Sequence, residues 1–69
     1  MKTLKINGSE KEFPGGIPET LAELLKKLNV KAETVVAEID GQIIERDNFK
    51  TTKLTEGQKI ELIRFVPGG

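Results

Sequence analysis

The 69-residue sequence contains no cysteine, histidine, tryptophan or tyrosine. Without cysteine the chain has no disulfides and no thiolate chemistry, and without histidine it lacks the commonest general base and the commonest metal ligand. Eleven basic residues balance eleven acidic ones, so bulk charge gives no reason to expect a nucleic acid or an anionic membrane as a partner. No stretch resembles a bilayer span or a signal peptide, and we therefore expect a cytoplasmic protein.

The composition and length of the chain predict one small folded domain. Hydrophobic residues make up 36% of the chain and charged residues 32%, which is ordinary for a folded protein. A chain of this length buries only about 60% of its unfolded surface, so its core is small. Glycine adopts most backbone angles because it has no Cβ. We predict a domain over residues 1–66 and a flexible tail over residues 67–69, which ends in Gly68 and Gly69.

Two dipeptides divide the chain into hairpins. Asn7-Gly8 and Asp40-Gly41 are strong turn signals, because both residues of each pair tolerate the positive φ of a type I′ turn. Apolar and polar residues alternate on either side of them, as in strands with one buried face. We expect Phe49 to fill the core from an irregular segment. The predicted strands are residues 1–6, 9–13, 34–39, 42–44 and 59–66.

One helix is predicted over residues 17–29. Its leucines recur at the spacing of a single helix face, and Pro18 suits the first helical position. This face can either bind a partner or form the core. We favour the core, because a small sheet with one helix needs that face for cover. The leucines of the face are Leu21, Leu24, Leu25 and Leu28.

The sequence gives little support for a catalytic or phosphate-binding role at any of its residues. The loop at Pro14-Gly15-Gly16 lacks the spacing and the lysine of a phosphate-binding loop. Arg46 and Asp47 are adjacent charges without a histidine, and such pairs are usually solvated. The chain contains no combination of nucleophile and base. We therefore predict that it is not an enzyme and that it binds no cofactor or metal of its own.

The two faces of the last strand are distinguishable. Ile60 and Leu62 share one face, whereas Glu61, Ile63 and Phe65 share the other. We expect the first face to meet the helix, because the opposite assignment would bury Glu61, and an unpaired buried carboxylate is costly. Large apolar groups then stand exposed beside the tail and form a docking patch. The partner-binding residues that we predict are Ile63, Phe65 and, from the strand at residues 34–39, Val36.

The order of elements predicts an α+β fold of the β-grasp type. The first and last strands can lie parallel at the centre of a mixed four- or five-stranded sheet, with the helix packed on one face. At this point the chain resembles the ThiS sulfur carriers of thiamine biosynthesis, which share the ubiquitin-like fold. The resemblance rests on Thr20-Leu21-Ala22-Glu23-Leu24-Leu25, residues 36–46, Leu54-Thr55-Glu56-Gly57, and the strand that leads to Gly-Gly. Pro67 and Gln58 depart from the family pattern, which often has glycine and aspartate there.

The resemblance implies a chemistry for the tail. An α-carboxylate is ionised at neutral pH and is a poor acyl donor. In the family an E1-like partner uses ATP and Mg²⁺ to adenylate the terminal glycine, and a sulfur nucleophile from a cysteine desulfurase system converts it to a thiocarboxylate. Thiazole synthase then receives the sulfur. Carried over to this chain, the reacting residue is Gly69, at the end of a tail comprising Val66, Pro67, Gly68 and Gly69.

Three alternatives remain open from the sequence. A sulfur carrier of the molybdopterin synthase small-subunit type uses the same tail chemistry with another acceptor. A ubiquitin-like modifier forms an isopeptide bond to lysine instead. The last alternative is an interaction domain whose Gly-Gly end is inert.

Overall fold

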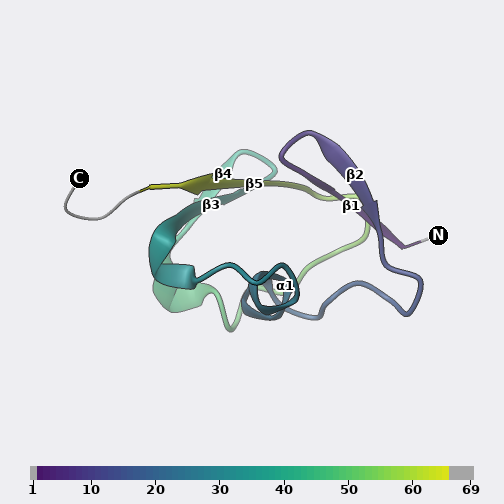
Figure 1. The fold of residues 1–69 in the computed structure, drawn as a ribbon, viewed down its shortest axis with the longest axis horizontal. Helices are drawn as coiled ribbons and strands as arrows, with labels where there is room; N and C mark the ends of the chain where they lie inside the picture. The colour runs from purple at the N-terminus through teal and green to yellow at the C-terminus, as the bar shows by residue number, and fades with distance from the viewer. Residues whose placement is uncertain (1, 66–69) are drawn as a thin grey trace.

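A computed structural model gives the fold of the chain and describes residues 2–65. These residues form a mixed five-stranded sheet with one helix packed against one face, and no helix covers the other face in the part described (Figure 1). The sheet order is β2-β1-β5-β3-β4. The elements are β1 (Thr3–Ile6), β2 (Ser9–Glu12), α1 (Leu21–Lys27), β3 (Val35–Ile39), β4 (Gln42–Ile44) and β5 (Lys59–Arg64).

The centre of the sheet agrees with the predicted β-grasp arrangement. Strand β5 lies between β1, to which it is parallel, and β3, to which it is antiparallel. Two hairpins therefore flank the last strand, one on each side. Both hairpin turns have the predicted backbone, with φ of 51° at Asn7 and 84° at Gly8, and 50° at Asp40 and 87° at Gly41. All four angles lie in the left-handed region that a type I′ turn requires.

The helix is shorter than predicted at its N-terminal end. It begins at Leu21 rather than at residue 17, and Pro18 is not its first residue, so both predictions were wrong. Thr20 is the N-cap, with an extended backbone (φ −127°), and its hydroxyl accepts a 3.3 Å hydrogen bond from the Glu23 backbone N–H. The cap satisfies one of the N–H groups that a helix start leaves without a partner.

The C-terminal end of the helix also differs from the prediction. Asn29 adopts φ of 61°, outside the helix. Its N–H donates to the Lys26 carbonyl, and the Val30 N–H donates to the Leu25 carbonyl. This pair of bonds is a Schellman motif, which ends a helix with one left-handed residue. The helix therefore ends at Lys27, two residues before the predicted end.

The core lies between α1 and the inner face of the sheet. Its fully buried side chains include three of the predicted leucines, and Phe49, which follows a short 3₁₀ helix at Arg46–Asn48, is 3% exposed. The leucine stripe is thus core, and Phe49 fills the core from an irregular segment, as predicted. Within residues 2–65, no helix has the length and hydropathy needed to cross a membrane. The largest fully buried side chains are Leu4, Leu21, Leu24, Leu25 and Ile60.

Candidate docking face beside the tail

The last strand presents its two faces as predicted. Ile60 is fully buried and Leu62 is half-buried on the helix side. Ile63 and Phe65 stand on the opposite face, 51% and 39% exposed. Because neighbouring side chains of a strand alternate between faces, Glu61 remains in solvent with them. Two large apolar side chains are thereby left uncovered where β5 ends.

Pairing with the neighbouring strands enlarges this exposed apolar surface. Val36 lies directly opposite Ile63 in the β3–β5 ladder and is 39% exposed. Ile43 of β4 is 66% exposed and lies opposite Glu38 of β3. Exposed apolar side chains that gather on one face often mark an interaction site. We call this surface the open-face patch; it comprises Val36, Ile43, Ile63 and Phe65.

Ile43 was missed by sequence reasoning. It is followed by Ile44, so apolar residues occupy both faces of the three-residue strand β4, and alternation cannot assign them. The register decides: Ile44 pairs with Ala37 and is half-buried, whereas Ile43 pairs with Glu38 and is exposed.

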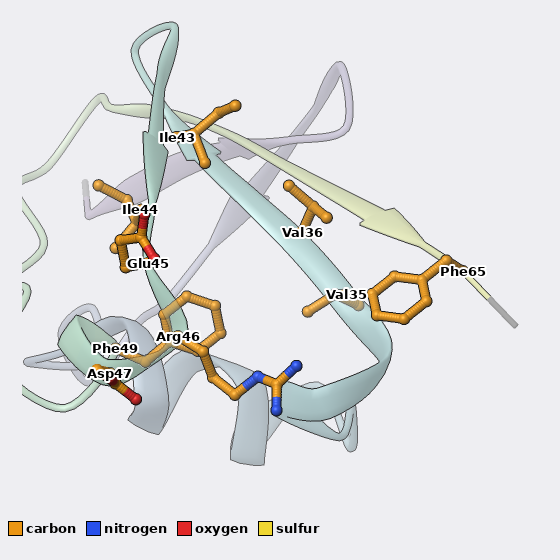
Figure 2. Close-up of a pocket in the computed structure, with 9 residues that line it drawn as sticks. All are labelled: Val35, Val36, Ile43, Ile44, Glu45, Arg46, Asp47, Phe49 and Phe65. Carbon is orange, nitrogen blue, oxygen red and sulfur yellow. The ribbon is translucent and has the colours of Figure 1, made fainter. Parts of the chain in front are cut away.

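A hollow of about 350 Å³ adjoins the open-face patch. Figure 2 shows it between the β3–β4 hairpin, the 3₁₀ helix at Arg46–Asn48 and the ring of Phe65. Val35, Phe49 and Phe65 contribute apolar surface to its lining. The Arg46 side chain extends toward the side of Val35 and Phe65, and the Asp47 side chain points away from it. The hollow thus combines apolar walls with the guanidinium group of Arg46 and the carboxylates of Glu45 and Asp47.

Arg46 and Asp47 are both exposed and form no ion pair with each other. The ion pair present among residues 2–65 joins Lys53 and Glu19 at 3.8 Å, on the surface, where such pairs contribute little stability. The prediction that Arg46 and Asp47 are solvated is confirmed. The guanidinium therefore remains available to a carboxylate of another molecule.

The face that carries the patch also carries two like-signed pairs of charges. Glu38 of β3 lies directly opposite Glu61 of β5, and Lys5 of β1 lies opposite Lys59. All four belong to the face that carries the patch, because the residues before and after them in their strands are buried or half-buried. Like charges directly opposite each other are unfavourable in a sheet. The acidic pair lies between the apolar end of the face and its basic end.

The chain leaves the sheet at a defined point. The Phe65 backbone N–H donates a 2.9 Å hydrogen bond to the Thr34 carbonyl, which extends the ladder one residue beyond β5. The predicted reacting residue and tail, residues 66–69, lie outside the described residues. The open-face patch includes Phe65, which is the last described residue. The patch therefore lies next to the start of the tail in the sequence. Within residues 2–65, no three carboxylates cluster as metal ligands do.

A profile of the ThiS family matches residues 4–69. The chain belongs to the ThiS family. The crystal structure of a thiamine biosynthesis protein (ThiS) from Geobacter metallireducens superposes with a TM-score of 0.83 at 34% identity, covering 97% of this chain and 99% of that one. The solution structure of a thiamine biosynthesis protein from the same organism gives a TM-score of 0.79 at 34% identity, covering 97% of this chain and 87% of that one. The β-grasp fold inferred from the sequence is thus the fold of ThiS.

A larger protein also contains a ThiS-like segment. The thiazole synthase of Paramagnetospirillum magneticum (strain ATCC 700264 / AMB-1) is 30% identical to this chain over 66 residues. The match covers 96% of this chain and 20% of that protein, so this chain spans about one fifth of the relative's length.

Proposed function

We propose that this chain is a sulfur carrier that supplies sulfur for thiazole formation in thiamine biosynthesis. The observation that carries the proposal is the ThiS family match, which runs to residue 69 and therefore includes both tail glycines. The thiazole synthase relative supports thiazole synthase as the acceptor, because that protein carries a ThiS-like segment in the same polypeptide. In this role the chain is a co-substrate of partner enzymes and not a catalyst.

The proposed reaction takes place at the α-carboxylate of Gly69. An oxygen of the carboxylate attacks the α-phosphate of ATP on an E1-like partner, and pyrophosphate leaves. The resulting acyl adenylate has AMP as a good leaving group. The terminal sulfur of a cysteine desulfurase persulfide then attacks the carbonyl carbon and expels AMP, which forms an acyl disulfide. A thiol reductant cleaves the S–S bond of that intermediate, is itself oxidised, and leaves a thiocarboxylate on Gly69. ATP and Mg²⁺ belong to the activating partner, and the carrier itself binds no cofactor.

The described residues would act by positioning the tail. A partner that covers Ile63 and Phe65 holds the chain where it leaves β5. From Arg64 to Gly69 an extended chain spans at most about 20 Å, enough to enter an active site while the domain stays outside. Holding the reacting group in place turns a bimolecular encounter into a local reaction. Arg46, in the adjoining hollow, is suited to pair with a carboxylate on the same partner.

Intact mass spectrometry tests the proposal. The protein is measured before and after incubation with ATP, Mg²⁺, an E1-like adenylating enzyme, a cysteine desulfurase with cysteine, and a thiol reductant. We expect a mass gain equal to sulfur replacing oxygen, localised to the last residue. Two controls leave the domain intact and displace the carboxylate: deletion of Gly69, and addition of one alanine after Gly69. Both should abolish the gain; an unchanged gain in the deletion variant would refute the carrier role.

A further inference from the structure

We propose that the edge of β5 at residues 62–64 is a strand-pairing site for an extended segment of the thiazole synthase. This inference rests on the proposed function and adds main-chain recognition to the contacts of the open-face patch. It follows from the directions in which the backbone groups of β5 point, and from the place where β1 stops.

Backbone groups in a strand point alternately to its two sides. The N–H groups of Phe65 and Lys59 donate toward β3 and its turn, at 2.9 Å to the Thr34 carbonyl and 3.0 Å to Asp40 Oδ1. The backbone N–H and C=O groups of odd-numbered β5 residues therefore point toward β3. The backbone groups of even-numbered residues, including Leu62 and Arg64, point to the side on which β1 lies.

Strand β1 covers only the first part of that side. Its ladder with β5 pairs Lys5 with Lys59 and Ile6 with Ile60. The Asn7 N–H then donates to the Ile60 carbonyl at 2.9 Å, and Asn7 Oδ1 accepts from the Leu62 N–H at 2.7 Å. After Asn7 the chain turns into β2, so the coverage ends.

Three backbone groups lie beyond this point. The carbonyls of Leu62 and Arg64 and the N–H of Arg64 face the uncovered side and have no partner within residues 2–65. A strand edge with unpaired donors and acceptors is a template for another strand. The two outer edges of the sheet are less suitable: β2 reads Ser-Glu-Lys-Glu and is exposed throughout, and β4 has three residues.

The occupant that matches these groups is an extended backbone. A single residue of the partner strand can donate its N–H to the Leu62 carbonyl and accept from the Arg64 N–H through its own carbonyl, which is how strand addition recognises a sheet edge. Residues 65–69 follow directly in the sequence. A strand paired at residues 62–64 thus lies where the tail begins, and it is suited to form one wall of the slot that receives Gly69.

Proline and alanine at position 64 separate main-chain pairing from side-chain contacts. Arg64→Ala keeps the N–H and removes the guanidinium group. Arg64→Pro also removes the N–H and places a ring on the uncovered side, where proline is tolerated in a strand because no internal bond is lost. Binding to the organism's own thiazole synthase is measured by isothermal titration calorimetry. We expect Arg64→Pro to bind at least about tenfold more weakly than Arg64→Ala, because a partner carbonyl loses its donor. Equal affinities would refute the pairing.

Amide hydrogen exchange tests the pairing in the unmodified protein, independently of how Arg64→Pro folds. In the free chain the Arg64 amide should exchange quickly, whereas the Phe65 amide, bonded to Thr34, is already protected. Saturating thiazole synthase should slow exchange at Arg64 by at least about tenfold. Unchanged exchange at Arg64 in the complex would refute the pairing.

The two proposals fail separately. Sulfur gain at Gly69 together with equal affinity of Arg64→Pro and Arg64→Ala contradicts the pairing alone. Protection of Arg64 in the complex without any sulfur gain contradicts the carrier role alone.

Discussion

Asn7 and Leu62 are 55 positions apart in the sequence, and Asn7 Oδ1 accepts a 2.7 Å hydrogen bond from the Leu62 backbone N–H. Asn7 has two roles at once. Its backbone, at φ 51°, forms the turn between β1 and β2. Its side chain continues the hydrogen-bonding ladder of β1 by one step on β5, and so determines where the covered part of the β5 edge ends.

This relationship predicts the effect of replacing Asn7. Asn7→Gly keeps the left-handed backbone and removes the acceptor, so the free energy of unfolding should fall by about 1 kcal/mol. Asn7→Asp keeps an acceptor oxygen and tolerates the same φ, and it should remain within about 0.5 kcal/mol of the wild type. Urea denaturation measures both. A glycine variant as stable as the wild type would mean that water replaces the side chain without cost.

The N-cap of α1 gives a second prediction. Thr20→Ala removes the hydroxyl that accepts from the Glu23 N–H, and should lower the free energy of unfolding by about 1 kcal/mol. Thr20→Ser keeps the hydroxyl and should change stability by less than half as much. The stabilities of the two variants are compared by thermal unfolding, followed by circular dichroism at 222 nm because helices give a strong signal there. Equal losses would assign the effect to the threonine methyl group rather than to the cap.

Substitutions of two phenylalanines, one exposed and one buried, should have opposite effects on stability and on partner binding. Phe65 is 39% exposed in the open-face patch and Phe49 is 3% exposed in the core. Phe65→Glu should leave the free energy of unfolding within about 0.5 kcal/mol and weaken binding to thiazole synthase at least about tenfold, because hot-spot aromatics dominate interfaces. Phe49→Ala should instead lower stability by about 3–5 kcal/mol.

Urea denaturation and calorimetric titration distinguish these two outcomes. Loss of folding in Phe65→Glu would show that the faces of β5 are assigned the wrong way round. Wild-type affinity in a folded Phe65→Glu would remove Phe65 from the docking face.

The acidic pair on the open face gives a fourth prediction. Glu61→Gln removes one of two like charges that face each other across β3 and β5, and should raise the free energy of unfolding by about 0.2–0.5 kcal/mol at low salt. The gain should shrink in 1 M NaCl, where the screening length is about 3 Å. Glu56→Gln, at an exposed turn residue, is the matched control and should show no such gain. An equal gain in both variants would reflect net charge rather than the Glu38 and Glu61 pair.

Much of the fold was predictable because the relevant preferences are local. Asn7-Gly8 and Asp40-Gly41 tolerate positive φ wherever they occur, and both form the predicted turns. The start of the helix was mispredicted although the sequence contained the evidence. Thr20 and Glu23 have capping-box spacing, and the Thr20 hydroxyl accepts a hydrogen bond from the Glu23 N–H. Pro18 lies before this N-cap and therefore outside the helix.

The candidate site was only partly predictable. Alternation along one strand placed Ile63 and Phe65 on the exposed face, and it also gave Val36 the correct face of its own strand. Alternation could not place Ile43, since Ile44 follows it, and it could not reveal the hollow beside Arg46, whose lining comes from three separate segments. Both depend on how strands pair, and pairing is not a property of any one segment.

The sequence by itself determined the turns, the core face of the helix, the two faces of β5 and the family, because each depends on residue type and spacing along the chain. Only the tertiary structure decided that Asn7 reaches Leu62, that Glu38 opposes Glu61, and that the β1 ladder stops at Ile60, which leaves the β5 edge at residues 62–64 without a neighbouring strand among residues 2–65. These relationships join segments far apart in the sequence. They are selected by the burial of one shared core, which fixes the order and register of the strands together.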